Sequence, residues 1–187
     1  YWCVSRESVG CTDSSALNYS PAATADDGSC RWCAEGVVDL PVDAVARKQL
    51  DFSTGSASSA ACQWMIQCDE IAVMWFAHVH TQSQNYISVY DGDSKDAQRI
   101  AHVSGSRANP DPLPAHEDKM LISFDSGSDV KSDSFEAEYW CVSRESVGCT
   151  ENSALNYSPV ATVDDGSCRW CAEGVVDLPI NAATRQQ

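Results

Sequence analysis

The stretch Cys62-Gln-Trp-Met-Ile-Gln-Cys68 places its two cysteines, a tryptophan and an isoleucine at every second position. Successive side chains of a β-strand point to opposite faces, so these four residues share one buried face. The next run, Ile71 to Ala77, is apolar on both faces, which is typical of a central strand in a sandwich. Together the two segments predict a β-sheet protein with an apolar core.

Three further segments have the character of short strands. Tyr86 to Tyr90 ends at an Asp-Gly turn, Met120 to Phe124 alternates, and Phe135 to Tyr139 turns its aromatic residues inward and two glutamates outward. Clusters of Gly, Pro, Ser and Asp separate these segments, and no helical period is present. The sequence therefore predicts an all-β sandwich.

The chain contains an internal repeat. Residues 1–49 recur as residues 139–187 with nine differences, which is an offset of 138. A period of that length corresponds to a whole domain rather than to one turn of a solenoid. We interpret the chain as a window on a tandem array with four parts: a Cys-rich spacer at 1–32, a sandwich at 33–139, a second spacer at 140–170, and the start of the next sandwich at 171–187.

Charge and hydropathy exclude several classes of function. Twelve Lys and Arg against 27 Asp and Glu give a net charge of -15, which repels nucleic acid and anionic lipid. The longest apolar run, Ile71 to Ala77, is too short to cross a bilayer. We therefore expect no nucleic-acid partner and no membrane insertion.

The ten cysteines indicate disulfides and an extracellular location. Two C-x-x-C pairs occur, Cys30 with Cys33 and Cys168 with Cys171. Neither has the second pair of soft ligands that a zinc site needs.

Each spacer contains a loop bounded by cysteines, Cys11 to Cys30 and Cys149 to Cys168. A segment this small buries too little surface to fold unaided, and a disulfide closing about 20 residues contributes roughly 3 kcal/mol. Both loops resemble the G-C-T-D-x-x-A-x-N-Y-x-P-x-A-x-x-D-D-G-S-C repeat of secreted and surface proteins of many microbes. The resemblance implies an extracellular spacer and no activity.

The spacer carries two kinds of candidate site. Asp13, Asp26 and Asp27 are either calcium ligands or turn caps that accept hydrogen bonds from nearby amides. Asn18 and Asn156 each begin an Asn-Tyr-Ser sequon, which predicts N-linked glycans on the surface of a secreted protein.

Several pieces of sequence follow one another between residues 33 and 139, and their order and spacing resemble the CUB domain family: Cys33, Cys62-x-Trp-x-Ile66, Ile71-x-Val-x-Trp75, Tyr86-Ile-x-Val-Tyr-Asp-Gly92, Leu121-Ile-Ser-Phe124 and Phe135-x-Ala-x-Tyr139. The resemblance implies a jelly-roll-like sandwich of two antiparallel sheets. It also implies an extracellular module that usually binds proteins or glycans, and a disulfide between Cys33 and Cys62.

The chain departs from the family pattern at the calcium site. Asn85 stands where the family usually has Asp, and Thr81 stands roughly where it has Glu. Asp125 and Asp129 are out of register with the family's acidic pair. We therefore do not expect calcium to bind in the manner of the family.

The family's second disulfide has no counterpart, because no cysteine lies between Cys68 and Cys141. Both residues continue the inward face of their strands, and a bridge between them would tie the end of the sandwich to the next spacer. Cys141 with Cys149 is the local alternative. If Cys68 and Cys141 pair, Cys3 should pair with the preceding repeat and Cys171 with the following one.

Catalytic residues are not apparent in the sequence. His78 and His80 form an H-x-H pair on one strand face, and His102 and His116 lie elsewhere without a carboxylate or cysteine placed to complete a metal site. A G-x-S-x-G elbow and a Gly-rich phosphate loop are both absent. We expect a protein that is not an enzyme and requires no cofactor. Calcium is the one ion whose binding the sequence leaves open.

Two functions fit these observations. The first is a structural subunit of an extracellular glycoprotein filament or surface appendage, whose partners are its own adjacent repeats and covalently attached glycans. Only Arg31 and Trp32 separate Cys30 from Cys33, so successive modules are held closely. The second is an adhesin or receptor ectodomain that binds protein or glycan through its CUB-like domains.

Overall fold

The structure is a computed structural model that describes residues 8–14, 16–43, 46–54, 61–107, 111–126 and 133–170. It divides into two compact units, residues 1–144 and 145–187, which are considered separately. The described residues contain strands and one turn of 3-10 helix, η1 (Arg144–Ser146). Among them, no helix has the length and hydropathy needed to cross a membrane.

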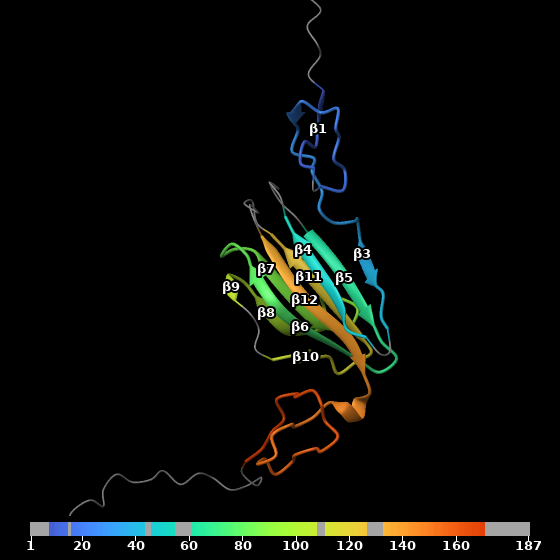
Figure 1. Cartoon of the computed structure of the whole chain (residues 1–187), viewed down its shortest axis with the longest axis vertical. Coiled ribbons are helices and arrows are strands. Elements are labelled where there is room, and N and C mark those ends of the chain that lie inside the picture. Colours follow the sequence, from blue (N-terminus) through green and yellow to red (C-terminus); the bar gives the residue numbers. More distant parts are fainter. Residues whose placement is uncertain are drawn as a thin grey trace, which may run out of the picture. The chain divides into compact units, whose positions relative to one another are not determined.

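Two five-stranded sheets make up most of the first unit (Figure 1). One sheet has the order β10-β6-β12-β4, with β9 also paired to β6, and all of its pairings are antiparallel. Its strands are β4 (Lys48–Ser53), β6 (Ile71–His80), β9 (Ser106–Arg107), β10 (Leu113–Pro114) and β12 (Ser134–Val142).

The other sheet has the order β3-β5-β11-β7-β8. Its pairings are antiparallel except for β3 with β5, which run parallel. Its strands are β3 (Val37–Leu40), β5 (Ala61–Gln67), β7 (Tyr86–Asp91), β8 (Gln98–Val103) and β11 (Lys119–Asp125). The predicted all-β sandwich is confirmed, with all five predicted strands present.

The inner faces of the two sheets form one apolar core. Trp64 and Ile66 of β5 belong to it, together with Phe135 and Tyr139 of β12, as the alternation predicts. Phe52 of β4 lies with its ring centroid 5.2 Å from that of Trp64 and 5.4 Å from that of Phe135. Aromatic side chains of this kind supply much of the buried apolar area that stabilises a sandwich.

Strand β12 is longer than the sequence predicts. Its pairing with β6 continues through Trp140 and Cys141 to Val142, which lies opposite Ile71. Trp140 is only 9% exposed, and Cys141 packs against the core. The boundary expected after residue 139 therefore falls inside a strand, because the ladder with β6 provides partners for three more residues.

The first spacer is held by a short parallel pair, β1 (Val9–Gly10) and β2 (Ala25–Asp26). Its backbone is closed by hydrogen bonds such as that from the Ser20 N–H to the Cys11 carbonyl, at 2.9 Å. The second spacer, in the other unit, has the corresponding bond from the Ser158 N–H to the Cys149 carbonyl, at 3.0 Å. The two copies thus fold alike, as expected from their near-identical sequences.

Candidate functional site

Four disulfides link the described cysteines, and their Cα atoms lie 4.7 to 5.6 Å apart, within the usual range. The pairs are Cys11–Cys30, Cys33–Cys62, Cys68–Cys141 and Cys149–Cys168. The local alternative, Cys141 with Cys149, is therefore not formed. Cys3 and Cys171 lie outside the described residues.

Strand β5 has a disulfide at each end. Cys62 is the second residue of the strand and joins it to Cys33, in the segment before β3. Cys68 follows the strand directly and joins it to Cys141 in β12, which belongs to the other sheet. The Cys68 N–H also donates to the Asp118 carbonyl at 2.8 Å. The two sheets are thus covalently linked through the end of β5.

The junction between the first spacer and the sandwich leaves little free chain. The Arg31 N–H donates to Oδ1 of Asn18 at 2.7 Å, and the Arg31 carbonyl accepts from the Leu17 N–H at 2.7 Å. The next residue, Trp32, packs against the sandwich core. The hydrogen bonds of the spacer therefore end one residue before the apolar contacts of the sandwich begin.

Trp32 is a junction residue without an expected role in the sequence. The feature that marks it is a tryptophan between two cysteines in both copies of the repeat. Its counterpart Trp170, in the other unit, is 62% exposed.

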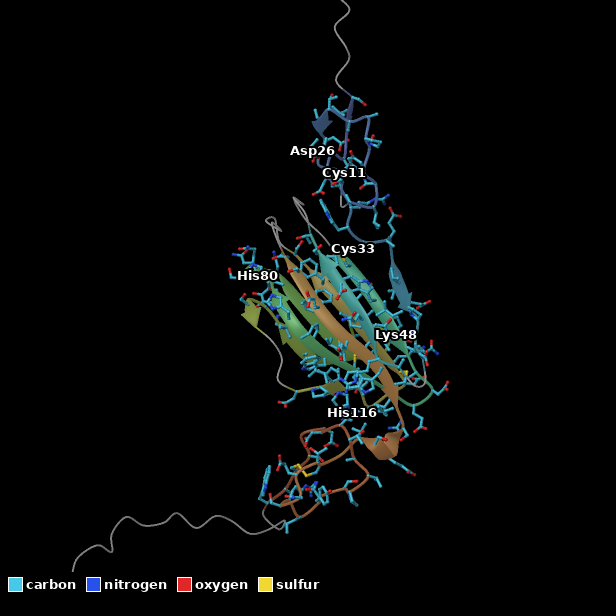
Figure 2. The ribbon with its side chains drawn as sticks, viewed as in Figure 1. Cys11, Asp26, Cys33, Lys48, His80 and His116 are labelled. Atoms are coloured by element: carbon cyan, nitrogen blue, oxygen red, sulfur yellow. A yellow bond between two sulfur atoms is a disulfide. The ribbon has the colours of Figure 1, made fainter. Side chains whose placement is uncertain are left out.

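Asp26 and Asp27 act as acceptors for the turn that follows them. Oδ1 of Asp26 accepts from the Gly28 N–H at 2.7 Å, and Oδ1 of Asp27 accepts from the Ser29 N–H at 3.0 Å. Hydrogen bonds from the Ser29 hydroxyl and N–H lower the pKa of Asp27 below its ordinary value of 3.8. Figure 2 places Asp26 and Cys11 in the same small loop.

The second spacer repeats this arrangement. Oδ1 of Asp164 accepts from the Gly166 N–H at 2.7 Å, and Oδ2 accepts from the Thr150 hydroxyl at 2.8 Å. These bonds, first that from the Gly166 N–H, lower the pKa of Asp164. Asp165 accepts from the Ser167 N–H at 2.9 Å.

The third predicted acidic residue, Asp13, corresponds to Glu151 in the second copy. Its backbone carbonyl accepts from the Ala16 N–H at 3.1 Å.

Both sequon asparagines bridge their own spacer. Nδ2 of Asn18 donates to the Ser29 carbonyl at 2.7 Å, while its Oδ1 accepts from the Arg31 N–H. Asn156 makes the same two bonds, to the Ser167 carbonyl at 2.8 Å and from the Arg169 N–H at 2.7 Å. Each side chain therefore joins the middle of its loop to the end of the loop.

A buried polar cluster lies where β6, β4 and β12 meet their loops. Asp133 is fully buried, and its Oδ1 accepts from the Gln82 N–H at 2.7 Å while its Oδ2 accepts from Nδ2 of Asn85. The Asp133 backbone exchanges bonds with Thr54, whose N–H donates to the Asp133 carbonyl at 2.8 Å. This cluster fastens the loops at one end of the sandwich.

Thr81 completes the cluster. Its hydroxyl donates to the Asn85 carbonyl at 3.1 Å and accepts from the Gly105 N–H at 2.9 Å. Thr81 and Asn85 are positions that the family pattern marks, whereas Asp133 was not predicted because it lies in a polar stretch that resembles a surface loop.

Comparison with known families settles the identity of the sandwich. Residues 46–139, half of the chain, match the CUB domain family. The chain belongs to the CUB domain family. The sandwich is therefore a CUB sandwich, as the resemblance of its sequence implies.

Solved structures with this fold are similar at low identity. The CUB1-EGF-CUB2 domains of rat MASP-1 are 20% identical, with a TM-score of 0.45 and a match covering 57% of this chain and 43% of that one. The MASP-1 CUB2 domain, described as bound to Ca2+, is 13% identical, with a TM-score of 0.43 and a match covering 58% of this chain and 100% of that one. The extracellular region of zebrafish Gpr126/Adgrg6 is 22% identical, with a TM-score of 0.43 and a match covering 58% of this chain and 14% of that one.

This chain thus spans less than half the length of the rat MASP-1 and zebrafish chains. No curated protein sequence matches it.

The described carboxylates of this CUB sandwich are engaged by other groups. Calcium takes about six to eight oxygen ligands, and both oxygens of Asp133 already accept N–H groups that point at them. Asp125 binds Nζ of Lys95 at 2.8 Å instead, and Asp129 lies outside the described residues. The spacer carboxylates likewise face amide hydrogens. Among the described residues, no group of three or more His, Cys, Asp or Glu could hold a metal.

The four histidines of the CUB sandwich do not gather at one place. His78 and His80 are both exposed and lie two residues apart on β6. His80 bonds to the Ser106 hydroxyl at 2.8 Å and His116 to Oδ2 of Asp91 at 2.8 Å, and Figure 2 shows these two rings at different ends of the sandwich. His102 stacks on Tyr86 with centroids 4.4 Å apart. The structure therefore does not join His102 or His116 to the His78–His80 pair.

Two surface hollows accompany the disulfides of the CUB sandwich. One of about 230 Å³ lies beside Cys141 and is lined by Val42, Gln67 and Glu70, and one of about 330 Å³ surrounds Cys33. Pockets for small ligands usually have volumes of about 300–1,000 Å³.

Proposed function

We propose that this chain is a stretch of a secreted, tandemly repeated structural protein, in which CUB sandwiches alternate with small spacers along a filament or surface appendage. The observation that carries the proposal is the Cys68–Cys141 disulfide. It joins β5 to the last strand of the sandwich, which leads directly into the next spacer, so each spacer begins from a covalently anchored strand.

The repeat extends this fastening to the neighbouring units. Cys3 corresponds to Cys141 at the offset of 138, so its partner is the counterpart of Cys68 in the preceding repeat. Cys171 corresponds to Cys33, so its partner is the counterpart of Cys62 in the following repeat. Every cysteine then has a partner, and identical junctions recur along the array.

The junction residues support the same proposal. Trp32 packs against the core of the sandwich that follows its spacer, whereas the corresponding Trp170 is 62% exposed in its own unit. In a tandem array the next sandwich would cover Trp170 in the same way. Burying that ring would add apolar contact at each junction.

The CUB family and the disulfides support an extracellular location for the array. We include N-linked glycans at Asn18 and Asn156 in the proposal. The bond from Nδ2 of Asn18 to the Ser29 carbonyl uses one of two amide hydrogens, which leaves the other position for a sugar. The proposal involves no catalysis and no calcium.

The test uses a chain with three consecutive copies of residues 1–138, imaged by electron microscopy and mapped by mass spectrometry of unreduced peptides. We expect straight particles with one regular period, and crosslinked peptides joining the Cys3 counterparts of the second and third copies to the Cys68 counterpart of the preceding copy. Free thiols at these positions, or beads without a fixed spacing, would contradict the proposal. Flexible particles that capture a protein or glycan would instead favour an adhesin.

A further inference from the structure

The disulfides of the first unit are arranged in series along the chain. A covalent route enters the first spacer at Cys11 and crosses a disulfide to Cys30. From Cys33 it crosses a second disulfide to Cys62, and it then follows the backbone of β5.

The route also leaves the sandwich through a disulfide. At the end of β5 it crosses from Cys68 to Cys141, which lies in the last strand. The backbone then continues through Val142 to Cys149, where another disulfide leads to Cys168. Covalent connections therefore run from the start of one spacer to the end of the next, with β5 as the only strand of the sandwich that they follow from end to end.

Tension applied along the chain is transmitted by its shortest covalent connections. Hydrogen bonds and apolar contacts break and reform within microseconds to seconds, whereas uncatalysed disulfide rearrangement takes minutes to hours. The segments that the disulfides bypass span 19 residues in the spacer, 29 between Cys33 and Cys62, and 73 between Cys68 and Cys141. None of these segments is stretched while the disulfides are intact.

We propose that the disulfides form a tension path, so that pulling forces pass through each CUB sandwich along β5 alone and cannot extend the rest of it. This inference deepens the proposed function, on which its relevance to an array rests. The path itself is a property of this chain. The sandwich loops, which lie in the bypassed segments, are thereby protected from extension.

Strand β5 is suited to this role. Its residues are already extended, at about 3.3 Å per residue, so the segment from Cys62 to Cys68 has almost no length to release. It lies inside its sheet, between β3 and β11, and pairs with β11 over its full length from Ala61 to Gln67. The segment that bears the force is thus also supported on both edges.

The Cys68–Cys141 disulfide is the essential element of the path. Without it, tension would pass from Cys68 through β6 to β11 in turn and most of β12 before reaching Cys141. The 73-residue separation, at about 3.3–3.6 Å per residue, would then release roughly 250 Å of chain. The disulfide between Cys33 and Cys62 withholds about 100 Å by the same reasoning, and that between Cys11 and Cys30 about 65 Å.

The test is single-molecule force spectroscopy on the full chain, held by terminal protein tags, with Cys3→Ser and Cys171→Ser introduced to prevent unintended crosslinks. Under non-reducing conditions we expect no extension step of 100 Å or more before detachment. Cys68→Ala with Cys141→Ala should lengthen the extended chain by about 250 Å, and Cys33→Ala with Cys62→Ala by about 100 Å. The double variant at Cys11 and Cys30 is the matched control, with an expected gain of about 65 Å.

The total length increases by these amounts once the released segment has unfolded, whether the variant was folded or unfolded at the start of the pull. Steps of about 250 Å in the unreduced parent chain, or equal lengths for the three double variants, would overturn the tension path. Such a result would leave the array itself possible. Conversely, an intact tension path with free thiols at the Cys3 counterparts of a tandem chain would contradict the array alone.

Discussion

The CUB sandwich buries large side chains between two sheets, whereas the spacers bury almost none. Phe76, Phe124 and Phe135 are fully buried in the sandwich. Among the described residues of the first spacer only Cys11 and Ala16 are buried, while Leu17 is 68% exposed. The two regions therefore depend on different interactions: apolar burial in the sandwich, and a disulfide with hydrogen-bonded turns in the spacer.

Residues that hold the spacer together are the same in both copies. The disulfide-bonded cysteines, Asn18 and Asp26 recur, and each forms a disulfide or a hydrogen bond within the spacer. Of two positions with valine in place of alanine, Val160 is 61% exposed and Val163 is 4% exposed. An exposed change such as that at Val160 is tolerated because little packing depends on it.

The largest expected effect comes from a cavity in the sandwich. Phe124→Ala removes a fully buried ring that lies 5.0 Å from Phe52, and should lower the free energy of unfolding by about 3–5 kcal/mol. Urea unfolding followed by tryptophan fluorescence, to which the buried Trp64 contributes, measures this loss. Leu17→Ala in the spacer is the control and should change stability by no more than about 0.5 kcal/mol. Similar losses for both variants would refute the distinction between the regions.

Removing the disulfide of a spacer should unfold that spacer and spare the sandwich. Cys149→Ser with Cys168→Ser opens a loop whose closure contributes about 3 kcal/mol. Amide hydrogen exchange reports the result at the N–H groups of Leu155 and Ser158, which are bonded within the loop. These amides should lose protection while those of β11 keep it. Retained protection at Ser158 would mean that the hydrogen-bonded turns suffice without the disulfide.

The polar cluster of the sandwich should be less tolerant of change than the polar turns of the spacer. Asn85→Ala removes one donor to the fully buried Asp133 carboxylate and should cost about 1–3 kcal/mol. Ser94→Ala, at an exposed residue of the same sandwich, is the control. Equal denaturation midpoints for the two variants would show that Asp133 finds other donors.

The sequence predicts the strands whose pattern is set by burial and misses those whose pattern is weak. β5, β6, β7, β11 and β12 have alternating or continuous apolar residues, and all are present. β4 has only Leu50 and Phe52 buried among polar neighbours, and β8, at the edge of its sheet, buries only Val103. A short strand with so few apolar residues resembles a loop until its partner strand is known.

The candidate sites show the same limit. The cysteine pairs that the structure contains follow from loop size, strand parity and resemblance to a known family. Asp133 could not be predicted because its partners Gln82 and Asn85 lie 51 and 48 residues away in the sequence. Only the fold brings them together.

A smaller effect is expected at the asparagine that closes each spacer. Asn156→Asp keeps the oxygen that accepts from the Arg169 N–H but loses the donor to the Ser167 carbonyl, and Asn156→Ala loses both. In unglycosylated protein, the alanine variant should lose about 1–2 kcal/mol of spacer stability and the aspartate variant about half of that. Amide exchange at Leu155 measures both. If the aspartate variant loses more than half of the stability that the alanine variant loses, the donor matters more than the acceptor.

The smallest expected effect is a difference between the two regions in how their stability depends on pH. Partial desolvation of His102 and the nearby positive charge of Arg99 lower its pKa below 6.5, so the unfolded chain binds more protons there and sandwich stability falls as pH drops below about 6.5.

The pKa values of Asp27 and Asp164 are also lowered, but from 3.8. The corresponding loss of stability in the spacers therefore begins only below about pH 4. Between pH 6.5 and 4.5, urea unfolding should therefore show a decline in the free energy of unfolding of the sandwich, and His102→Gln should reduce that decline. Exchange protection at Ser158 should stay constant over the same range. Protection that falls at Ser158 over this range would instead place an additional titrating group in the spacer. A decline of the same size in the His102→Gln variant would assign the pH response of the sandwich to another residue.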